Sequence, residues 1–464
     1  MSSGGEMDVV VIGGGPGGYT AAERVAQLDG KVTLVEKDLL GGNCLNRGCI
    51  PAVALLRGAQ VFMLAKAASQ FGVKTGDVSL DYEGLIRRKN DMVGSLVAGT
   101  ERRMTSAGVN VVKGRANLGG PNVVEVVRRD GGLQTLKAKS IIVASGSTPM
   151  KPDVTVSGKN VLLMAEEALS LRRLPESMAI VGCDYVGVQL ACVFSLLGTD
   201  VKVFESGRHL LPEEDEEIAT LLQEILLSYG AETYTEATAK VITDLGPEKM
   251  LTYVRKGETH EVRVEEVVVS SGRRPNTEGI GLEKAGIVVN GSGGIVVDGH
   301  MRTNVPNVYG IGDAVGRFML AHVAMAEGVV AAENVMGRDQ EMDYRAVPRC
   351  IFTLPEAACA GLTEVQAKEE GRNVRVSRVP LMLNGYAHLM GQTEGLIKIV
   401  SDASYGEILG VQILGPQAGD LIHEAVLGMR LEATAEDLAK AIHVHPSYGE
   451  AMKDAAWRLY RPLF

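Results

Sequence analysis

Two cysteines, Cys44 and Cys49, are separated by four residues in a glycine-rich loop that reads GGNCLNRGC. Such a close thiol pair can form a redox-active disulfide, supply half of a metal site, or act as a structural clip. A metal site needs about two further ligands, and no other Cys/His pair in the sequence has the spacing of a metal-binding finger. Structural disulfides are rare in the reducing cytoplasm. The spacing therefore favours a redox pair without a metal, with the other two roles as alternatives.

The residues around the pair indicate how the two thiols meet. In an undistorted helix, residues five positions apart are about 7.5 Å apart along the axis. That separation exceeds the usual Cα span of a disulfide, roughly 4.4–6.8 Å. The pair therefore requires a distorted turn, for which Asn46 and Gly48 provide backbone freedom. Pro51 favours a helix that starts just after Cys49, and a helix N-terminus lowers the pKa of a nearby thiol.

The elements that must position this loop begin almost at the first residue. A strand-like run at 7–12 leads into a glycine turn, a helical pattern, and a second strand that ends at Glu36. This order is that of a dinucleotide-binding βαβ unit, with the helix N-terminus facing the phosphates and the acid facing the ribose. Three glycines allow the tight turn, the approach of a pyrophosphate, and close helix–strand packing: Gly13, Gly15 and Gly18.

A second unit of the same kind starts at residue 178, with turn glycines Gly182 and Gly187. Its second strand ends at Glu205, which suits the free ribose hydroxyls of NAD better than the phosphate of NADP. The turn is imperfect because Asp184 stands where the middle glycine belongs. Its carboxylate would repel an approaching pyrophosphate.

Small-residue turns at Gly146 and Gly272 follow buried strands and close the two dinucleotide-binding domains. A later strand ends in a Gly-Asp turn at Asp313, and from about Tyr344 the pattern changes to alternating strands followed by helices. We predict an α/β fold with two Rossmann-like domains and a C-terminal α+β domain. The expected domains are 1–150, 151–276, 277–343, which completes the first domain, and 344–464.

Composition narrows the possible partners. A net charge of −10 and an aromatic content of 4% argue against a nucleic-acid partner. No signal peptide precedes the first strand, and no apolar stretch approaches the roughly 20 residues of a membrane span, so we expect a cytoplasmic protein with no membrane partner. Four further cysteines lie singly in apolar surroundings and are expected in the core: Cys183, Cys192, Cys350 and Cys359.

Taken together, these segments resemble the pyridine nucleotide–disulfide oxidoreductases, and within that family the dihydrolipoamide dehydrogenases. The similarity covers nearly the whole chain and includes GGNCLNRGCIP, SGSTP, SGRRPN, GIGD with LAH, VPRCIFTLPE and HVHPSYGEAMKDAA, in the order of the family. The resemblance implies bound FAD, an NAD partner, and a homodimer formed by the C-terminal domain.

The resemblance also implies roles for individual residues. Cys49 lies against the flavin, Cys44 exchanges with the substrate disulfide or dithiol, His445 is the catalytic base, and Glu450 orients its imidazole. A lipoyl-bearing protein or a small dithiol would reduce the cysteine disulfide, and electrons would then reach FAD and NAD. The implied FAD-binding residues are Gly13, Gly15, Gly18, Glu36, Gly146, Asp313 and Ala321. The implied NAD-binding residues are Gly182, Gly187, Glu205 and Gly272.

The chain departs from the family pattern on the nicotinamide side. The family has a lysine three or four residues after the second cysteine, where this chain has Ala52 and Val53. It pairs that lysine with a glutamate, where this chain has Gln189. Losing both partners avoids a stranded buried charge, but it removes a cation that tunes the flavin. With Asp184, these changes give the hypothesis that dithiol–FAD exchange is intact and the NAD half-reaction is weak. The ring of Tyr185 either covers the nicotinamide pocket or is packing.

Two other functions fit the same motifs. The chain could reduce a different disulfide, or it could be a flavin-binding subunit that passes electrons to a protein partner. A mercuric reductase is disfavoured, because the last seven residues contain no cysteine pair.

Overall fold

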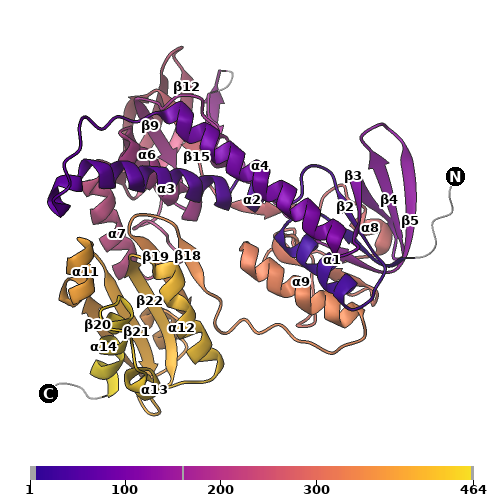
Figure 1. Ribbon diagram of the computed structural model, residues 1–464. Helices are drawn as coiled ribbons and strands as arrows, with labels where there is room; N and C mark the ends of the chain where they lie inside the picture. The colour runs from indigo at the N-terminus through magenta and orange to yellow at the C-terminus, as the bar shows by residue number, and fades with distance from the viewer. Residues whose placement is uncertain (1–6, 159–160, 461–464) are drawn as a thin grey trace. The chain divides into compact units, whose positions relative to one another are not determined.

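The computed structural model describes residues 7–158 and 161–460. The chain forms two compact units, each built from separated segments (Figure 1). Unit 1 contains residues 7–54, 84–151 and 272–343, and unit 2 contains the remaining described residues. The last four residues of the chain, part of the argument against a mercuric reductase, lie outside the described residues.

Unit 1 contains a parallel sheet in the order β3-β2-β1-β5-β17. The central strand β1 is rich in valine, and Val9, Val10 and Val11 are fully buried, as both faces of a parallel sheet require. The antiparallel strand β4 joins β3 to β5. The elements are β1 (Met7–Ile12), α1 (Pro16–Gln27), β2 (Val32–Glu36), α2 (Gly42–Asn46), α4 (Tyr82–Ser106), β3 (Asn110–Gly120), β4 (Val123–Arg128), β5 (Leu133–Val143), β6 (Ser147–Pro149), β16 (Arg273–Pro275), α8 (Leu282–Ala285), β17 (Val308–Gly310), η2 (Gly312–Ala314) and α9 (Ala321–Val335).

Helices α1 and α9 lie side by side against this sheet, as Figure 1 shows. Their backbones approach so closely that side chains are excluded at two glycines. A Cβ at Gly17 would lie 2.8 Å from the carbonyl oxygen of Ala324, and one at Gly328 would lie 2.6 Å from that of Gly17. The small-residue pattern of α9 is therefore explained by its contact with the helix that follows the first glycine turn.

The glycine-rich loop that contains Cys44 and Cys49 continues into α3 (Cys49–Lys66), which runs from unit 1 into unit 2. Together, α2 and α3 form a stretch, Gly42–Lys66, that is long and apolar enough to cross a membrane by length and composition. The prediction that no stretch reaches this length is therefore wrong, because only Arg47 and Gly48 separate α2 from α3 and most residues of α3 are apolar. Core helices of globular proteins pass the same test, so the stretch does not indicate a membrane.

The middle of the chain forms a second parallel sheet in unit 2, in the order β11-β10-β9-β15-β8. The antiparallel strands β14-β13-β12 follow, with β7 at their edge. The elements are η1 (Ala68–Phe71), β7 (Thr155–Ser157), β8 (Leu163–Met164), α5 (Ala165–Ala168), β9 (Ser177–Val181), α6 (Tyr185–Leu197), β10 (Asp200–Phe204), α7 (Glu216–Ser228), β11 (Glu232–Tyr234), β12 (Ala237–Asp244), β13 (Lys249–Arg255), β14 (Glu258–Val264) and β15 (Glu266–Val269).

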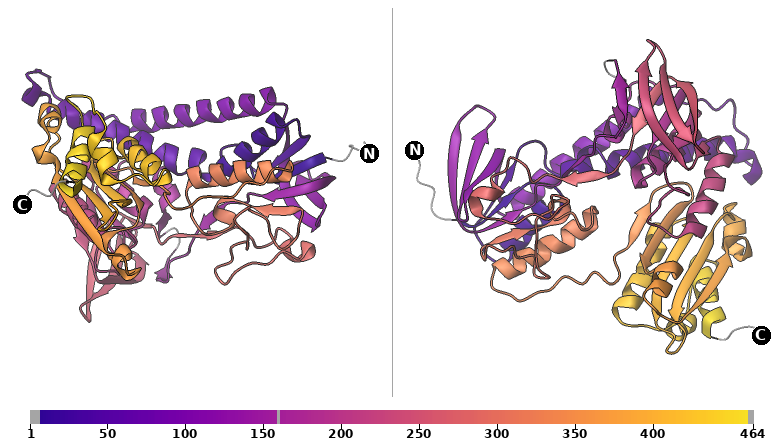
Figure 2. Two further views of the ribbon diagram at one scale, coloured as in Figure 1. Left: turned by 90° about the horizontal axis from the view of Figure 1, so that it is seen from below. Right: turned by 180° about the vertical axis from the view of Figure 1, so that it is seen from behind.

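The C-terminal part of unit 2 is an antiparallel sheet in the order β18-β19-β22-β21-β20, with α12 and α14 packed against it (Figure 2). Every residue of β22 is buried, so this strand lies at the centre of the core. The elements are β18 (Arg349–Ile351), β19 (Glu356–Gly361), α10 (Glu364–Glu369), β20 (Val374–Pro380), η3 (Leu381–Leu383), α11 (Gly385–Met390), β21 (Leu396–Asp402), β22 (Ile408–Gly415), α12 (Ala418–Arg430), α13 (Ala435–Lys440) and α14 (Gly449–Tyr460).

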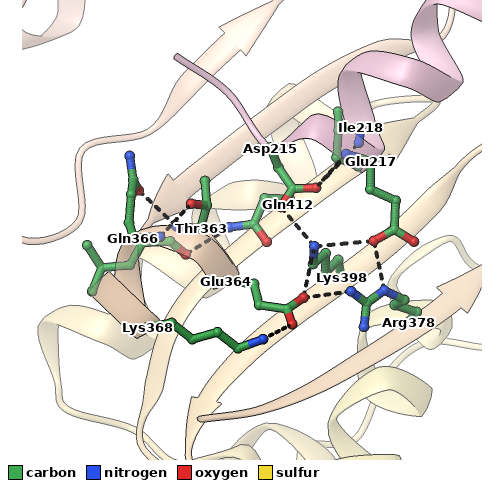
Figure 3. A network of polar contacts seen from close by, with 11 residues as sticks. Asp215, Glu217, Ile218, Thr363, Glu364, Gln366, Lys368, Arg378, Lys398 and Gln412 are labelled. Carbon is green, nitrogen blue, oxygen red and sulfur yellow. Dashed lines mark hydrogen bonds and ion pairs between the residues drawn. The ribbon is translucent and has the colours of Figure 1, made fainter. Parts of the chain in front are cut away.

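An ionic network joins α7 to this C-terminal sheet within unit 2 (Figure 3). Lys398 is 4% exposed, and its Nζ lies 2.8 Å from Asp215, 3.2 Å from Glu217 and 3.4 Å from Glu364. Arg378 bridges Glu217 and Glu364 at 2.7 and 2.6 Å. Because a buried cation without partners is costly, these contacts fix the α7 N-terminus on β21.

The predicted fold class is confirmed, with two Rossmann-like units and a C-terminal α+β domain. The observed elements differ from the predicted ones by a few residues. For example, the sequence predicts a helix from Tyr19 to Leu28 after the first glycine turn. The observed helix α1 begins three residues earlier, at Pro16, because proline is well tolerated in the first helical turn.

Candidate active site

The first glycine turn has the geometry that its sequence predicts. Gly13 has φ +104°, and a Cβ there would lie 2.2 Å from the carbonyl oxygen of Ala144. A Cβ at Gly18 would lie 1.8 Å from the carbonyl oxygen of Gly13. A Cβ at Gly15 would have its nearest neighbour, the Cα of Gly42, at 3.8 Å, so this position is less crowded than the other two. The turn therefore excludes side chains where strand and helix pack, and leaves room where a phosphate would approach.

The α1 N-terminus and Glu36 fit the adenosine diphosphate part of FAD. Gly15 is the N-cap of α1, and no side chain in the described part of the chain caps this helix end. Its amides are therefore available to an anion. The Glu36 carboxylate, 7% exposed, accepts hydrogen bonds from the amides of Gly14 (2.6 Å) and Asp38 (2.7 Å). It is thereby fixed where a ribose would bind.

A groove of about 430 Å³ opens directly after Glu36 in unit 1, at the adenosine end of this site. Five of its side chains are basic and one is acidic, so it also favours an anionic ligand. It is lined by Lys37, Asp38, Arg47, Gly114, Arg115, Val127, Arg128 and Arg129.

The two cysteines lie on a short helix, α2, and a long helix, α3, with a break between them at Arg47 and Gly48. Of the two residues predicted to provide backbone freedom, Gly48 lies in this break and Asn46 is the last residue of α2. Both are free thiols in this structure. The hydrogen bond between them raises the pKa of Cys44 and lowers the pKa of Cys49. Cys49 is exposed and begins α3, where a helix N-terminus favours a thiolate. The hydrogen bond and the helix end therefore both make Cys49 the more acidic thiol of the pair.

The Gly-Asp turn lies next to the cysteine pair in unit 1. Ser147 donates a hydrogen bond to Asp313, and the Arg273 guanidinium donates to Ser147 Oγ at 2.7 Å and to its carbonyl oxygen at 3.0 Å. The nearby positive charge of Arg273 lowers the pKa of Cys49, after the larger effect of Cys44. Glu327 on α9, 1% exposed, accepts from the Gly312 amide at 2.6 Å and so fixes the turn that carries Asp313.

Arg273 and Glu327 were not among the predicted site residues. Both act over long sequence separations, 126 residues from Arg273 to Ser147 and 15 from Glu327 to Gly312. The signals available in the sequence were the first arginine of SGRRPN and the first of two glutamates in a small-residue helix.

The remaining predicted FAD residues lie in the same unit. Gly146 has φ +75° and its carbonyl oxygen accepts from the Asn276 amide at 2.8 Å, and Ala321 begins α9. Gly272, predicted for NAD, has φ +86° and also belongs to unit 1, where its carbonyl oxygen accepts from Met150. Gly272 lies at the boundary between the two units, two residues after Ser270, whose carbonyl oxygen is next to Gly182, and its assignment to NAD remains a prediction.

The second glycine turn matches the first in backbone but not in electrostatics. Asp184 is the N-cap of α6 with φ −68° and ψ 178°, and Gly15 has φ −70° and ψ −177° at the same place in α1. The Asp184 carboxylate accepts from the amides of Val186 (3.0 Å) and Gly187 (2.9 Å), and Ser270 also donates to it. A carboxylate of the protein therefore occupies the anion position of this turn.

The ribose end of the second unit retains its predicted geometry. Glu205 accepts from the amides of Cys183 (3.0 Å) and Gly207 (2.7 Å), as Glu36 does in the first unit. Gln189 is 7% exposed, and its Nε2 has no hydrogen-bond partner among residues 7–158 and 161–460. The acid at the ribose end is thus held as in the first unit, and the two turns differ in the carboxylate at the helix end.

The histidine–glutamate pair lies in unit 2 at the start of α14. His445 Nδ1 is 2.9 and 3.1 Å from the two carboxylate oxygens of Glu450, and the Ser447 amide donates to Glu450 at 3.0 Å. These hydrogen bonds lower the pKa of Glu450. The His445 side chain is 82% exposed, so its Nε2 is accessible to a substrate. The His443 side chain is 9% exposed and pairs with Glu424 at 3.0 Å, in keeping with a structural role.

The core prediction for the isolated cysteines holds for Cys183 and Cys192, which are fully buried, whereas Cys350 is only half-buried. For Cys359 the predicted burial is correct, but the predicted apolar surroundings are wrong. This buried thiol lies 2.7 Å from the carboxylate of Glu214, so its surroundings are not apolar. The sequence could not show this contact because the two residues are 145 positions apart.

The fold and site together define a flavoprotein that exchanges electrons with thiols: one open dinucleotide turn next to a dithiol pair, a second dinucleotide unit, and an exposed imidazole paired with a carboxylate. The chain belongs to the pyridine nucleotide-disulphide oxidoreductase family, whose model matches residues 7–328. The dimerisation domain of the same family matches residues 347–456 and supports a homodimer.

Individual relatives agree with this assignment. The chain is 40% identical over 463 residues to a dihydrolipoyl dehydrogenase of Bacillus subtilis, covering 97% of each protein. It is 38% identical over 460 residues to a leghemoglobin reductase of Vigna unguiculata, covering 98% of this chain and 88% of that protein. It is also similar to a solved structure, a Cu(II) complex of the HOCl-induced flavoprotein disulfide reductase RclA from Escherichia coli. The TM-score is 0.88 and the identity 26%, covering 98% and 99% of the two chains.

Proposed function

We propose that this protein is a cytoplasmic FAD-dependent dithiol–disulfide oxidoreductase of the dihydrolipoamide dehydrogenase type. The overall reaction oxidises a dihydrolipoyl dithiol to its disulfide and transfers a hydride to NAD⁺, with release of one proton. The observation that carries the proposal is the hydrogen-bonded pair of Cys44 and Cys49, in which Cys49 is the more acidic thiol.

Each predicted site residue has a defined task in this proposal. FAD, held by the first glycine turn, Glu36 and the Asp313 turn, supplies a two-electron redox centre. Cys44, whose pKa is raised, is the thiol that exchanges with the substrate. His445 accepts the proton of the substrate thiol, and Glu450 holds the imidazole so that Nε2 faces outward.

The nicotinamide half-reaction is proposed to be the slower one. The Asp184 carboxylate occupies the helix end that a pyrophosphate would use, and like charges repel strongly where solvent is partly excluded. Val53 and Gln189 also remove the charged pair that the family resemblance implies near the flavin. The same observation favours a second candidate function, a flavin subunit that passes its electrons to a protein partner in place of NAD.

Anaerobic stopped-flow absorbance of the purified yellow protein tests this proposal. Dihydrolipoamide should reduce the flavin rapidly, and both Cys44→Ser and Cys49→Ser should abolish that phase. The matched change Cys350→Ser, at a half-buried thiol outside the pair, should leave it intact. If dihydrolipoamide does not reduce the flavin but another dithiol does, the lipoyl assignment is wrong. If NADH reduces the flavin as fast as dihydrolipoamide, the assignment of a slow NAD half-reaction is wrong.

A further inference from the structure

Glu214 lies in the loop before α7 and is almost completely buried, with its side chain 2% exposed. Three side chains donate to its carboxylate. The Tyr185 hydroxyl donates to Oε1, Arg349 donates to both oxygens at 2.7 and 3.0 Å, and the Cys359 thiol donates to Oε2 at 2.7 Å. Every lone-pair direction that a buried carboxylate needs to satisfy is thus used by the protein itself.

The charge of Glu214 is balanced by Arg349, because a buried carboxylate is stable only next to a cation. The bidentate contact also fixes the plane of the carboxylate. Arg349 and Cys359 are direct neighbours across strands β18 and β19, so the antiparallel C-terminal sheet presents both groups together. Burial, together with the charge of Glu214, raises the pKa of Tyr185. Its hydroxyl therefore stays protonated and donates to a rigid acceptor.

Tyr185 stands at the second dinucleotide turn. It is the first residue of α6, directly after Asp184, at the carboxyl end of β9. Ligands of parallel α/β sheets bind at this edge. A second contact joins the same two segments, because the Leu211 amide in the Glu214 loop donates to the Cys183 carbonyl oxygen at 3.3 Å. Two hydrogen bonds therefore connect the second glycine turn to the loop before α7, from Tyr185 to Glu214 and from Leu211 to Cys183. The same loop is bonded to Arg349 and Cys359 of the C-terminal sheet.

We propose that Glu214 and Arg349 are positioning residues of the pyridine-nucleotide site, which hold Tyr185 and the start of α6 in the geometry that receives the nucleotide. The inference rests on the proposed function only in taking a pyridine nucleotide as the ligand of the second unit. Neither residue need touch the ligand, since both act through the tyrosine ring. Residues of the dimerisation domain thereby set the affinity of the nucleotide domain.

Two conservative variants of the full-length holoenzyme each weaken the connection from Tyr185 through Glu214 to Arg349. Tyr185→Phe keeps the ring and removes the hydroxyl, and Arg349→Lys keeps the charge but loses the bidentate contact. Each should weaken NAD⁺ binding about fivefold, because a less organised site binds more weakly. The double variant should be no worse than either single one, because both changes break one connection. Tyr229→Phe, a change at another tyrosine of unit 2, should have no effect.

Low-affinity calorimetry with millimolar NAD⁺ measures binding without turnover, and hydrogen exchange of residues 183–190 measures the order of the turn. Faster exchange in Arg349→Lys is expected together with weaker binding. Wild-type affinity in Arg349→Lys would overturn the proposal. Additive effects in the double variant would overturn it too, because they would mean that the Tyr185 hydroxyl contacts the nucleotide directly. Dihydrolipoamide reduction of the flavin, followed in parallel, reports on the proposed function separately.

Discussion

Replacing Asp184 by glycine should convert the second dinucleotide turn into a copy of the first. The carboxylate accepts two amide hydrogen bonds at 3.0 and 2.9 Å, and the variant frees both amides for a phosphate. Two unit charges about 5 Å apart repel by about 3 kcal/mol at an effective dielectric constant of 20. Screening at this partly exposed turn reduces the gain to about 2 kcal/mol, which corresponds to about 30-fold tighter NAD⁺ binding.

The stability cost of this change should be small. Replacing an aspartate N-cap by glycine costs only a few tenths of a kcal/mol, and the backbone at Asp184 is extended, as at Gly15. NAD⁺ affinity is measured by calorimetry and the NADH half-reaction by stopped-flow, with the melting temperature as a check of folding. The NADH rate at low nucleotide concentration should rise with the affinity.

Two further variants test whether NAD⁺ binding is weakened by the charge of Asp184 or by the side-chain oxygen that occupies the α6 amides. Asp184→Asn keeps a side-chain oxygen on the amides but removes the charge, so its gain in affinity should be intermediate. Asp200→Asn removes a carboxylate paired with Lys202 at the start of β10 and should leave the affinity unchanged. If Asp184→Gly folds normally and binds NAD⁺ no more tightly than the wild-type protein, the carboxylate is not the obstacle and the electrostatic reasoning fails.

Three other predictions follow from the same contacts. Gly15→Asp should place a carboxylate on the free α1 amides and weaken FAD binding about 30-fold, seen as a lower ratio of flavin to protein absorbance, whereas Gly76→Asp in an open loop should not. Glu450→Gln should lower kcat with dihydrolipoamide about tenfold by releasing His445, and an unchanged kcat would contradict its role. The pKa of Glu364 is about 2 because hydrogen bonds from Lys368 and Arg378 lower it. The free energy of unfolding should therefore fall as the pH drops from 4.5 towards 2, and Glu364→Gln should lack this part of the slope in urea titrations.

The glycine turns could be predicted because their geometry is local. Gly13 and Gly18 exclude a side chain through contacts within one strand–turn–helix segment and its neighbouring strand, and the sequence spacing records this directly. The pair of His445 and Glu450 could also be predicted, since one short turn separates them. The break between the two cysteines followed from simple helix geometry.

The groups that control these residues could not be predicted in the same way. Arg273 reaches Ser147 across 126 residues, and Arg349 reaches Glu214 across 135. A single sequence contains no distance information at that range, and an arginine or glutamate in a turn is usually solvated. Only the folded chain shows that these charges are buried or shared. The division into units also differs from a simple reading of the sequence, because residues 55–83 pack with unit 2.

The two dinucleotide units provide an internal comparison that strengthens the argument about electron flow. Their N-caps have the same backbone angles, and their acidic residues Glu36 and Glu205 make the same kind of hydrogen bonds to the turn. The units differ at the N-cap side chain, which is absent at Gly15 and a carboxylate at Asp184. The backbone angles at the two N-caps are the same. We therefore expect the negative charge of Asp184 to lower the affinity of the second unit for its nucleotide. The first turn is open to an anion, and the second already contains one. In the proposed function, this asymmetry affects the step in which electrons leave the flavin and not the step in which thiols deliver them. The dithiol side should therefore behave like that of the relatives, and the nucleotide side should set the overall rate.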